Sequence, residues 1–230
     1  MKLTFLPLFK SDEDDDFDSA LFCLQDGDCD SALIEIKYES NHVLNKVANT
    51  NKKIFLDATG DYTSSRFRPG RDILLASKSA PMIVDSKGYR IPAARWNFFA
   101  DIQTPNDAQI VSDVLIPSDQ DKPASSITLP NQMLQKMLLG HAGDADDRPS
   151  ITNFLKLIDG TRNSEIKRSC KVLTHINDGH EFSVSDFLST ETDASIYIFD
   201  DNEAELFLQP VSQMVLTLLM NKMPTQTDRI

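Results

Sequence analysis

Lys53-Ile-Phe-Leu-Asp-Ala-Thr-Gly-Asp-Tyr62 is the stretch of sequence that decides the fold. Its apolar run, Ile54-Phe55-Leu56, has β-favouring side chains, and such a run is typical of a strand buried on both faces of a parallel sheet. The run stops at Asp57 and breaks at Gly60, which indicates a turn at the carboxyl end of the strand. In open α/β sheets ligands bind at that end, so the sequence directs attention to this turn.

Basic residues gather on both sides of a second apolar run, Ile73-Leu74-Leu75, which follows a Pro69-Gly70 turn and predicts a second strand. Residues 66–95 hold seven Lys and Arg against two Asp, a local charge of +5. The whole chain of 230 residues carries −12, of which residues 1–30 contribute −7. An acidic protein does not suit free-standing nucleic-acid binding, because affinity comes from neutralising phosphates. The basic segment is therefore the candidate electrostatic footprint.

A hairpin is predicted within the basic segment, at residues 82–91 with its turn at Ser86-Lys87-Gly88. Tyr89 lies among basic residues there, and aromatic side chains between cations are what single-stranded nucleic acid uses for stacking. A hairpin rim that extends its charges into solvent explains the same pattern equally well. The candidate DNA-binding residues are Arg66, Arg68, Arg71, Lys87, Tyr89, Arg90 and Arg95.

A series of short motifs resembles the conjugative type IV secretion coupling protein family, the TraD-like DNA-transfer ATPases. The turn motif is formed by Asp57, Gly60 and Asp61. The further motifs, in the family's order, are Phe67–Leu75, Trp96–Phe99, Phe182–Leu188, Ile196–Phe199 and Leu208–Val211. The resemblance implies an α/β fold: a partial RecA-like sheet with an inserted all-α subdomain. Members of the family usually begin with membrane helices, whereas here no apolar run approaches the roughly 20 residues that a spanning helix needs.

The expected organisation has four parts. Residues 1–30 form an acidic, mobile segment, and residues 31–95 form the first part of the RecA-like core with the hairpin inserted. Residues 96–190 form the all-α subdomain, and residues 191–230 return to the core as a strand and a helix. The periodicity and capping signals predict helices at 38–50, 104–116, 130–139, 150–158, 163–174 and 204–221, a strand at 195–199 and a polar loop at 118–127.

The nucleotide site of the resembled family has no counterpart in this sequence. In that family a G-x-x-x-x-G-K-[ST] loop precedes the helix expected here at 38–50, and its backbone amides and Lys hold the phosphates. This chain has no glycine between Gly27 and Gly60, and acidic side chains crowd the interval. The family's acidic catalytic strand would follow residue 221, and the sequence ends at Ile230 without it. We therefore expect no ATPase activity, no catalytic residue and no cofactor.

Two patterns that suggest a metal site are incomplete. Asp26, Asp28 and Asp30 have the first spacings of a calcium loop, but Ser31 and Lys37 stand where Gly and Glu are required. The series Cys170-x₄-His175-x₄-His180 lacks a fourth ligand at zinc spacing. We expect no metal.

The cysteines indicate a reduced, cytosolic compartment, because there are three of them and no C-x-x-C pair. Contact with the inner membrane would come through partners. Two functions remain open. The first is a degenerate or truncated coupling-protein relative that acts in conjugative DNA transfer or type IV secretion without ATPase activity. Its partners would be single-stranded DNA, coupling-protein subunits or other secretion components. The second is a regulatory protein–protein interaction module that keeps only the scaffold, with its acidic N-terminus mimicking nucleic acid.

Overall fold

A computed structural model gives the fold of residues 21–25, 32–38, 50–57, 59–117, 124–143, 149–190, 192–199 and 207–222. It is a mixed α/β structure, as expected from the sequence. The strands are β1 (Leu21–Gln25), β2 (Ala32–Tyr38), β3 (Thr50–Asp57), β4 (Ile73–Ala76) and β5 (Ala194–Phe199). The helices are α1 (Asp61–Arg66), α2 (Pro105–Leu115), α3 (Ala124–Ala142), α4 (Ile151–Asp159), α5 (Ser164–Ser169), α6 (Val184–Ser189) and α7 (Leu208–Lys222), with 3₁₀-helices η1 (Phe98–Asp101) and η2 (Cys170–His175).

The sheet has the strand order β1-β2-β3-β5-β4. Strands β3, β5 and β4 are parallel, whereas β1 and β2 form an antiparallel hairpin beside β3. The predicted strands at residues 54–56, 73–75 and 195–199 are confirmed. Their continuous apolar runs are explained by cover on both faces, because Ile54, Phe55 and Leu56 are all buried.

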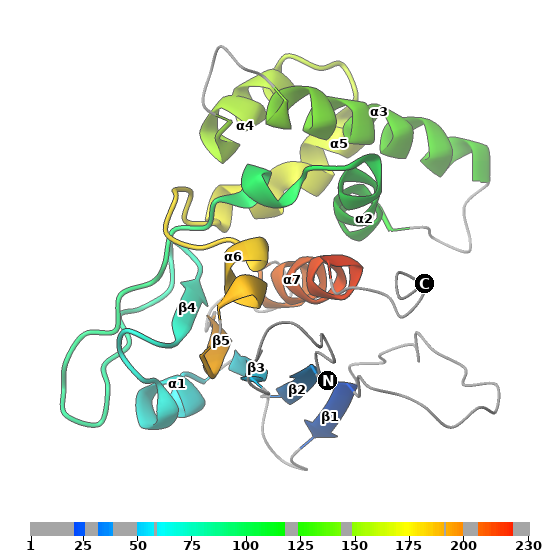
Figure 1. Ribbon diagram of the computed structural model, residues 1–230. Helices are drawn as coiled ribbons and strands as arrows, with labels where there is room; N and C mark the ends of the chain where they lie inside the picture. The colour runs from blue at the N-terminus through cyan, green and yellow to red at the C-terminus, as the bar shows by residue number, and fades with distance from the viewer. Residues whose placement is uncertain are drawn as a thin grey trace, which may run out of the picture.

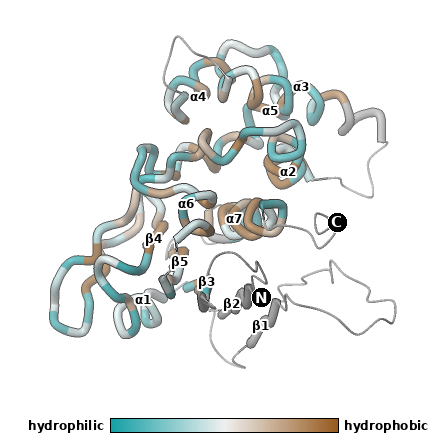
Figure 2. The backbone as a smooth tube through the Cα atoms, in the orientation of Figure 1, coloured by the Kyte–Doolittle hydropathy of each residue, from teal (hydrophilic) through white to brown (hydrophobic). Residues whose placement is uncertain are grey.

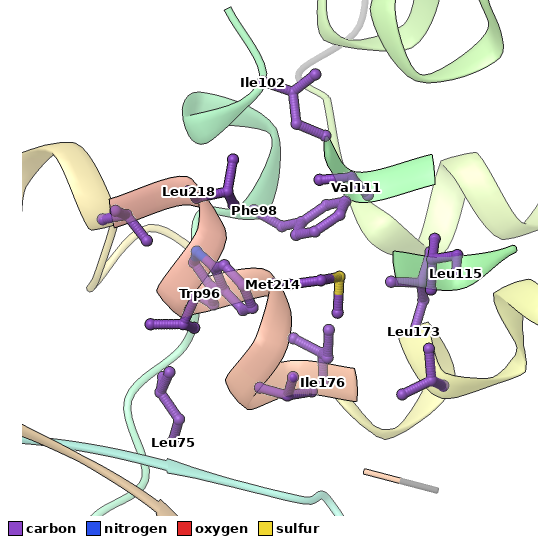
Figure 3. Close-up of a cluster of buried hydrophobic side chains, with 14 of the residues drawn as sticks. Leu75, Trp96, Phe98, Ile102, Val111, Leu115, Leu173, Ile176, Met214 and Leu218 are labelled. Carbon is purple, nitrogen blue, oxygen red and sulfur yellow. The ribbon is translucent and has the colours of Figure 1, made fainter. Parts of the chain in front are cut away.

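One face of the parallel strands packs against helices. Alternate residues of the strands point to this face, and α6 and α7 lie on it, with α2 beyond α7 (Figure 1). Helix α7 is coloured largely hydrophobic along its length in Figure 2, in keeping with its position between the sheet and α2. Figure 3 shows this core, in which Trp96 and Phe98 lie beside Met214 and Leu218 of α7, with Val111 and Leu115 of α2 close by. The sheet and the helices between β4 and β5 therefore share one core.

The other face of the parallel strands carries a smaller cluster. The remaining alternate positions, Phe55, Leu74, Ala76, Tyr197 and Phe199, point to it. Its cover comes from α1, the loop that follows α1, and the connection between β4 and η1, which contribute Tyr62, Phe67, Ile83 and Ile91. The rings of Phe55 and Tyr197 stack with centroids 4.6 Å apart. This cluster fixes the basic segment on the sheet.

The helix predicted at 38–50 is wrong at both ends. Tyr38 ends β2, Thr50 begins β3, and the two are direct partners in the antiparallel ladder. Residues 39–49 lie outside the described residues. The pairing of β2 with β3 thus extends to both end residues of the predicted helix. The segment that the family resemblance aligned with a phosphate loop is thus a strand in its described part.

Several other boundaries also differ from prediction. Helix α3 begins at Ala124 and runs past Gly140 to Ala142, so the polar loop predicted at 118–127 is wrong for residues 124–127. The helix predicted at 163–174 is α5 followed by η2. Leu21–Gln25, inside the segment expected to be mobile, forms β1. The helix at 104–116 is confirmed with its capping box, in which Asp107 donates its backbone amide to the Thr104 hydroxyl and its carboxylate accepts from Thr104.

Candidate nucleic-acid interface

The candidate site is built by the loop after α1 and by the hairpin at residues 82–91. The hairpin is confirmed: Ile91 donates its amide to the carbonyl of Ile83 at 3.0 Å, and Val84 and Arg90 form an antiparallel bridge. Because side chains alternate along a strand, Ile83 and Ile91 are buried on the sheet while their neighbours Val84 and Arg90 face outward. The segment extends from β4 on the side away from β3, at the left of Figure 1.

The turn of the hairpin is held by one carboxylate. Asp85 Oδ1 accepts the backbone amides of Lys87 and Tyr89 at 2.9 and 2.8 Å. Gly88 has φ of +81°, a left-handed conformation that other residues adopt only with strain. This arrangement presents Tyr89 with 70% of its surface exposed.

The Asp57–Asp61 turn has a structural role. Asp57 is fully buried, and its carboxylate accepts the backbone amides of Gly60 and Thr63 at 2.9 and 2.7 Å together with the Thr63 hydroxyl. It therefore stabilises the first turn of α1 in the manner of a capping residue. Gly60 has φ of +83° beside the ring of Phe199. Asp61 is exposed and accepts a hydrogen bond from Thr59.

Two of the candidate arginines are engaged in ion pairs. Arg68 donates from Nε and Nη2 to Asp72, whose carboxylate also accepts the backbone amide of Ser195 in β5. Arg95 donates from its backbone amide and Nε to Glu181, and those hydrogen bonds hold the pKa of the Glu181 carboxyl below its ordinary value. These two arginines neutralise neighbouring carboxylates, so they add little to the local positive potential.

The other four candidate cations, Arg66, Arg71, Lys87 and Arg90, are exposed. Within the described part of the chain, no carboxylate forms an ion pair with any of them. Arg66 lies over the ring of Tyr62 at 5.2 Å, and Arg71 donates to the backbone carbonyl of Asp193 at 3.0 Å. We call these four residues the unpaired cations. They supply the charge that remains available to an anionic ligand.

A cavity of about 280 Å³ lies between the hairpin and the loop after α1. It brings together Tyr89 and Arg90, which the sequence suggested. Of the carboxylates that line it, Asp72 and Glu181 are in ion pairs with Arg68 and Arg95. Its other apolar lining residues were not predicted from the sequence, although the inward-facing Ile91 of the hairpin was a usable signal. The lining that matters for its chemistry is formed by Phe67, Pro69, Asp85, Tyr89, Arg90 and Ile91.

The aromatic motif at residues 96–99 belongs to the core. Trp96 is buried, and its indole donates to Asp101 Oδ2 at 2.8 Å. Asp101 also accepts the backbone amides of Val184 and Ser185, at the start of α6. Burial raises the pKa of the Asp101 carboxyl, although its hydrogen bonds act in the opposite direction. The motif therefore joins η1 to α6.

The described residues contain no group of three His, Cys, Asp or Glu side chains placed to hold a metal ion. Cys170 lies in the core, and burial raises the pKa of its thiol to about 12. A thiol so resistant to ionisation is a packing residue, because metals bind the thiolate. Among the helices that the structure describes, none is long and apolar enough to cross a membrane.

No family model matches this sequence, and no curated protein matches it either. Among solved structures, the chain is similar to the bacterial conjugative coupling protein TrwBdeltaN70 in its unbound monoclinic form. The TM-score is 0.53 at 13% sequence identity, over 75% of this chain and 45% of that chain. The present chain thus spans less than half the length of that structure. At this identity the similarity shows the fold alone, a mixed α/β arrangement with three parallel strands that is consistent with a partial RecA-like fold.

Proposed function

We propose that this protein acts in conjugative DNA transfer or type IV secretion as a relative of the coupling proteins that binds DNA and does not hydrolyse ATP. The observation that carries the proposal is the group of unpaired cations on the loop after α1 and on the hairpin. In a chain with net charge −12, these four cations make their segment locally positive. The fold shared with a conjugative coupling protein supplies the biological setting.

The lack of ATPase activity is part of the proposal. It is supported by the sequence between Gly27 and Gly60, which has no glycine-rich loop, and by β2, which pairs antiparallel with β3 where the resemblance would place a phosphate loop. The turn after β3 does not compensate, because its buried Asp57 accepts backbone amides of the kind that would otherwise be offered to a phosphate.

The binding expected of this surface is weak and independent of sequence. Lys and Arg side chains that neutralise phosphates provide affinity without reading bases. The rest of the protein is acidic and repels the same phosphates, so affinity should fall steeply as salt screens the local attraction.

A matched pair of double variants tests the proposal by fluorescence anisotropy with a labelled oligonucleotide at low salt. Lys87→Gln with Arg90→Gln removes two unpaired cations from the hairpin. Arg162→Gln with Lys171→Gln removes two exposed cations from the helical region and changes the net charge equally. The first variant should bind more weakly than the wild type and the second should not. Equal binding by both variants, or no binding by the wild type, contradicts the proposal.

A second candidate function is the docking of another protein, including a coupling-protein subunit. Leu129 and Met133 are four residues apart on α3, so they lie on one face of the helix, with 74% and 40% of their surfaces exposed. Replacing both with Gln would weaken association with a coupling-protein subunit in a pull-down. Unchanged association would exclude this face as the contact.

A further inference from the structure

The cavity beside the hairpin has the size of a site for a single ring system. Ligand pockets for drug-sized molecules occupy roughly 300–1,000 Å³, and this cavity of about 280 Å³ lies just below that range. Its apolar lining comes from Phe67, Pro69 and Ile91, and Tyr89 stands at its border with most of its ring exposed. It could hold one flat ring but not a whole nucleoside triphosphate.

The charges around the cavity are also informative. Three carboxylates line it, but Asp72 is matched by Arg68 and Glu181 by Arg95. The third, Asp85, directs Oδ1 to two amides of the hairpin turn. Arg90 lines the same cavity and has no ion-pair partner among the described residues. The ligand that suits this combination has a flat, largely apolar ring attached to an anion.

We infer that the cavity accepts one unstacked nucleobase of a single-stranded nucleic acid, with the ring against Tyr89 and Phe67 and the adjoining phosphate near Arg90. The inference rests on the proposed function and narrows it to single strands. Base–aromatic stacking tolerates any sequence, because every base has a π-face. Bases in a duplex are already stacked and paired, and extracting one costs several kcal/mol. The cavity thereby favours single strands over duplexes.

The test compares a labelled single-stranded oligothymidylate with an abasic strand of the same number of phosphates. The two probes present equal charge, so the ratio of their affinities reports the bases alone. For the wild type, the oligothymidylate should bind about tenfold more tightly than the abasic strand, as expected for one stacked base. A duplex of equal length should bind no more tightly, per phosphate, than the abasic strand.

Four variants locate the effect. Tyr89→Ala removes the stacking surface, and Ala93→Leu fills the cavity from its lining; both should bring the ratio towards one. Tyr89→Phe keeps the ring and should keep the ratio. Val84→Ala, at an exposed hairpin residue that does not line the cavity, is the control and should also keep it. Thermal melting of each variant verifies folding. If only one of Tyr89→Ala and Ala93→Leu folds, the affinity ratio of that variant is enough to test the site.

The outcomes separate this inference from the proposed function. If both probes bind equally and with salt dependence, the surface binds phosphates and the nucleobase site is refuted. If neither probe binds at low salt, the proposed function fails and the nucleobase site fails with it. A ratio that survives in both Tyr89→Ala and Ala93→Leu refutes the cavity as the site. If an acidic polyglutamate peptide displaces the strand from the wild type but not from Tyr89→Ala, the cavity takes a protein side chain instead.

Discussion

The indole nitrogen of Trp96 and the carboxylate of Asp101 lie 2.8 Å apart in the core, and the same carboxylate accepts two backbone amides at the start of α6. One buried side chain therefore contacts a residue 84 positions away from it in the sequence. Its hydrogen bonds are what make the charged group tolerable in an apolar surrounding.

Asp101→Asn should destabilise the protein by about 1–3 kcal/mol, because the amide group donates where the carboxylate accepts and leaves a buried N–H unsatisfied. Asp186→Asn, the same exchange at an exposed position of α6, is the control. Burial raises the pKa of Asp101 above its ordinary 3.8, so the folded state holds the proton where the unfolded state has released it. The contribution of this group to stability is therefore largest below pH 3.8 and falls as pH rises towards the raised pKa. Urea unfolding across that interval should show this dependence in the wild type; its persistence in Asp101→Asn would contradict the assignment.

Two glycines should respond in opposite directions to alanine. Gly60→Ala places a Cβ at φ +83° and 3.3 Å from the Phe199 ring, and should cost about 1–2 kcal/mol. Gly140→Ala lies in α3 with open space around its Cβ, and should stabilise by about 0.5–1 kcal/mol. Thermal melting of both variants checks the pair. Equal effects would show that the turn after β3 does not require the left-handed conformation.

Replacing the two ion-paired arginines of the candidate interface should lower the free energy of unfolding by different amounts. Arg68→Met leaves the fully buried carboxylate of Asp72 without its strongest partner, and should cost about 2 kcal/mol or more. Arg95→Met breaks a pair whose side chains are 60% and 48% exposed, and should cost less than about 1 kcal/mol. Chemical denaturation of the two variants measures the difference. A larger cost for Arg95→Met would overturn the ranking.

ATP with Mg²⁺ should not raise the melting temperature. A true site at 100-fold saturation would stabilise the fold by about 2.7 kcal/mol, a shift of several degrees that differential scanning fluorimetry detects easily. We also expect no phosphate release above the protein-free rate. A reproducible shift with ATP that AMP does not produce would contradict the expected lack of a nucleotide site, and phosphate release above the protein-free rate would contradict the expected lack of hydrolysis.

The sequence predicted those strands and helices whose formation depends on residues close to one another in the chain. The continuous apolar runs of β3 and β5 and the capping box of α2 each combine a pattern with a physical requirement met within a few residues. The helix prediction failed at residues 38 and 50, because these two residues pair with each other in the antiparallel ladder of β2 and β3. Lys52 illustrates what remained hidden: its ammonium donates to the carbonyls of Thr190 and Thr192, and burial lowers its pKa. No residue near Lys52 in the sequence indicates that its partner lies 138 residues away.

The sequence predicted the candidate interface as a group of basic residues and one tyrosine. The structure shows which of those basic residues form ion pairs and which do not. Arg68 and Arg66 are two residues apart and look alike in the sequence, yet among the described residues a carboxylate forms an ion pair with Arg68 and none does with Arg66. Glu181, the partner of Arg95, is 86 residues distant. Which cations stay available depends on tertiary contacts, so composition alone overstated the positive charge of the segment.

The salt dependence of DNA binding tests the central claim most directly. Each phosphate contact on a single strand contributes about −0.7 to the slope of log K against log salt concentration. Lys87→Gln with Arg90→Gln should therefore make the slope shallower by about 1.4, whereas Arg162→Gln with Lys171→Gln should leave it unchanged. Anisotropy titrations of the wild type and both variants over a range of salt concentrations give the three slopes. Identical slopes for all three proteins would contradict the assignment of the unpaired cations as the DNA-binding surface.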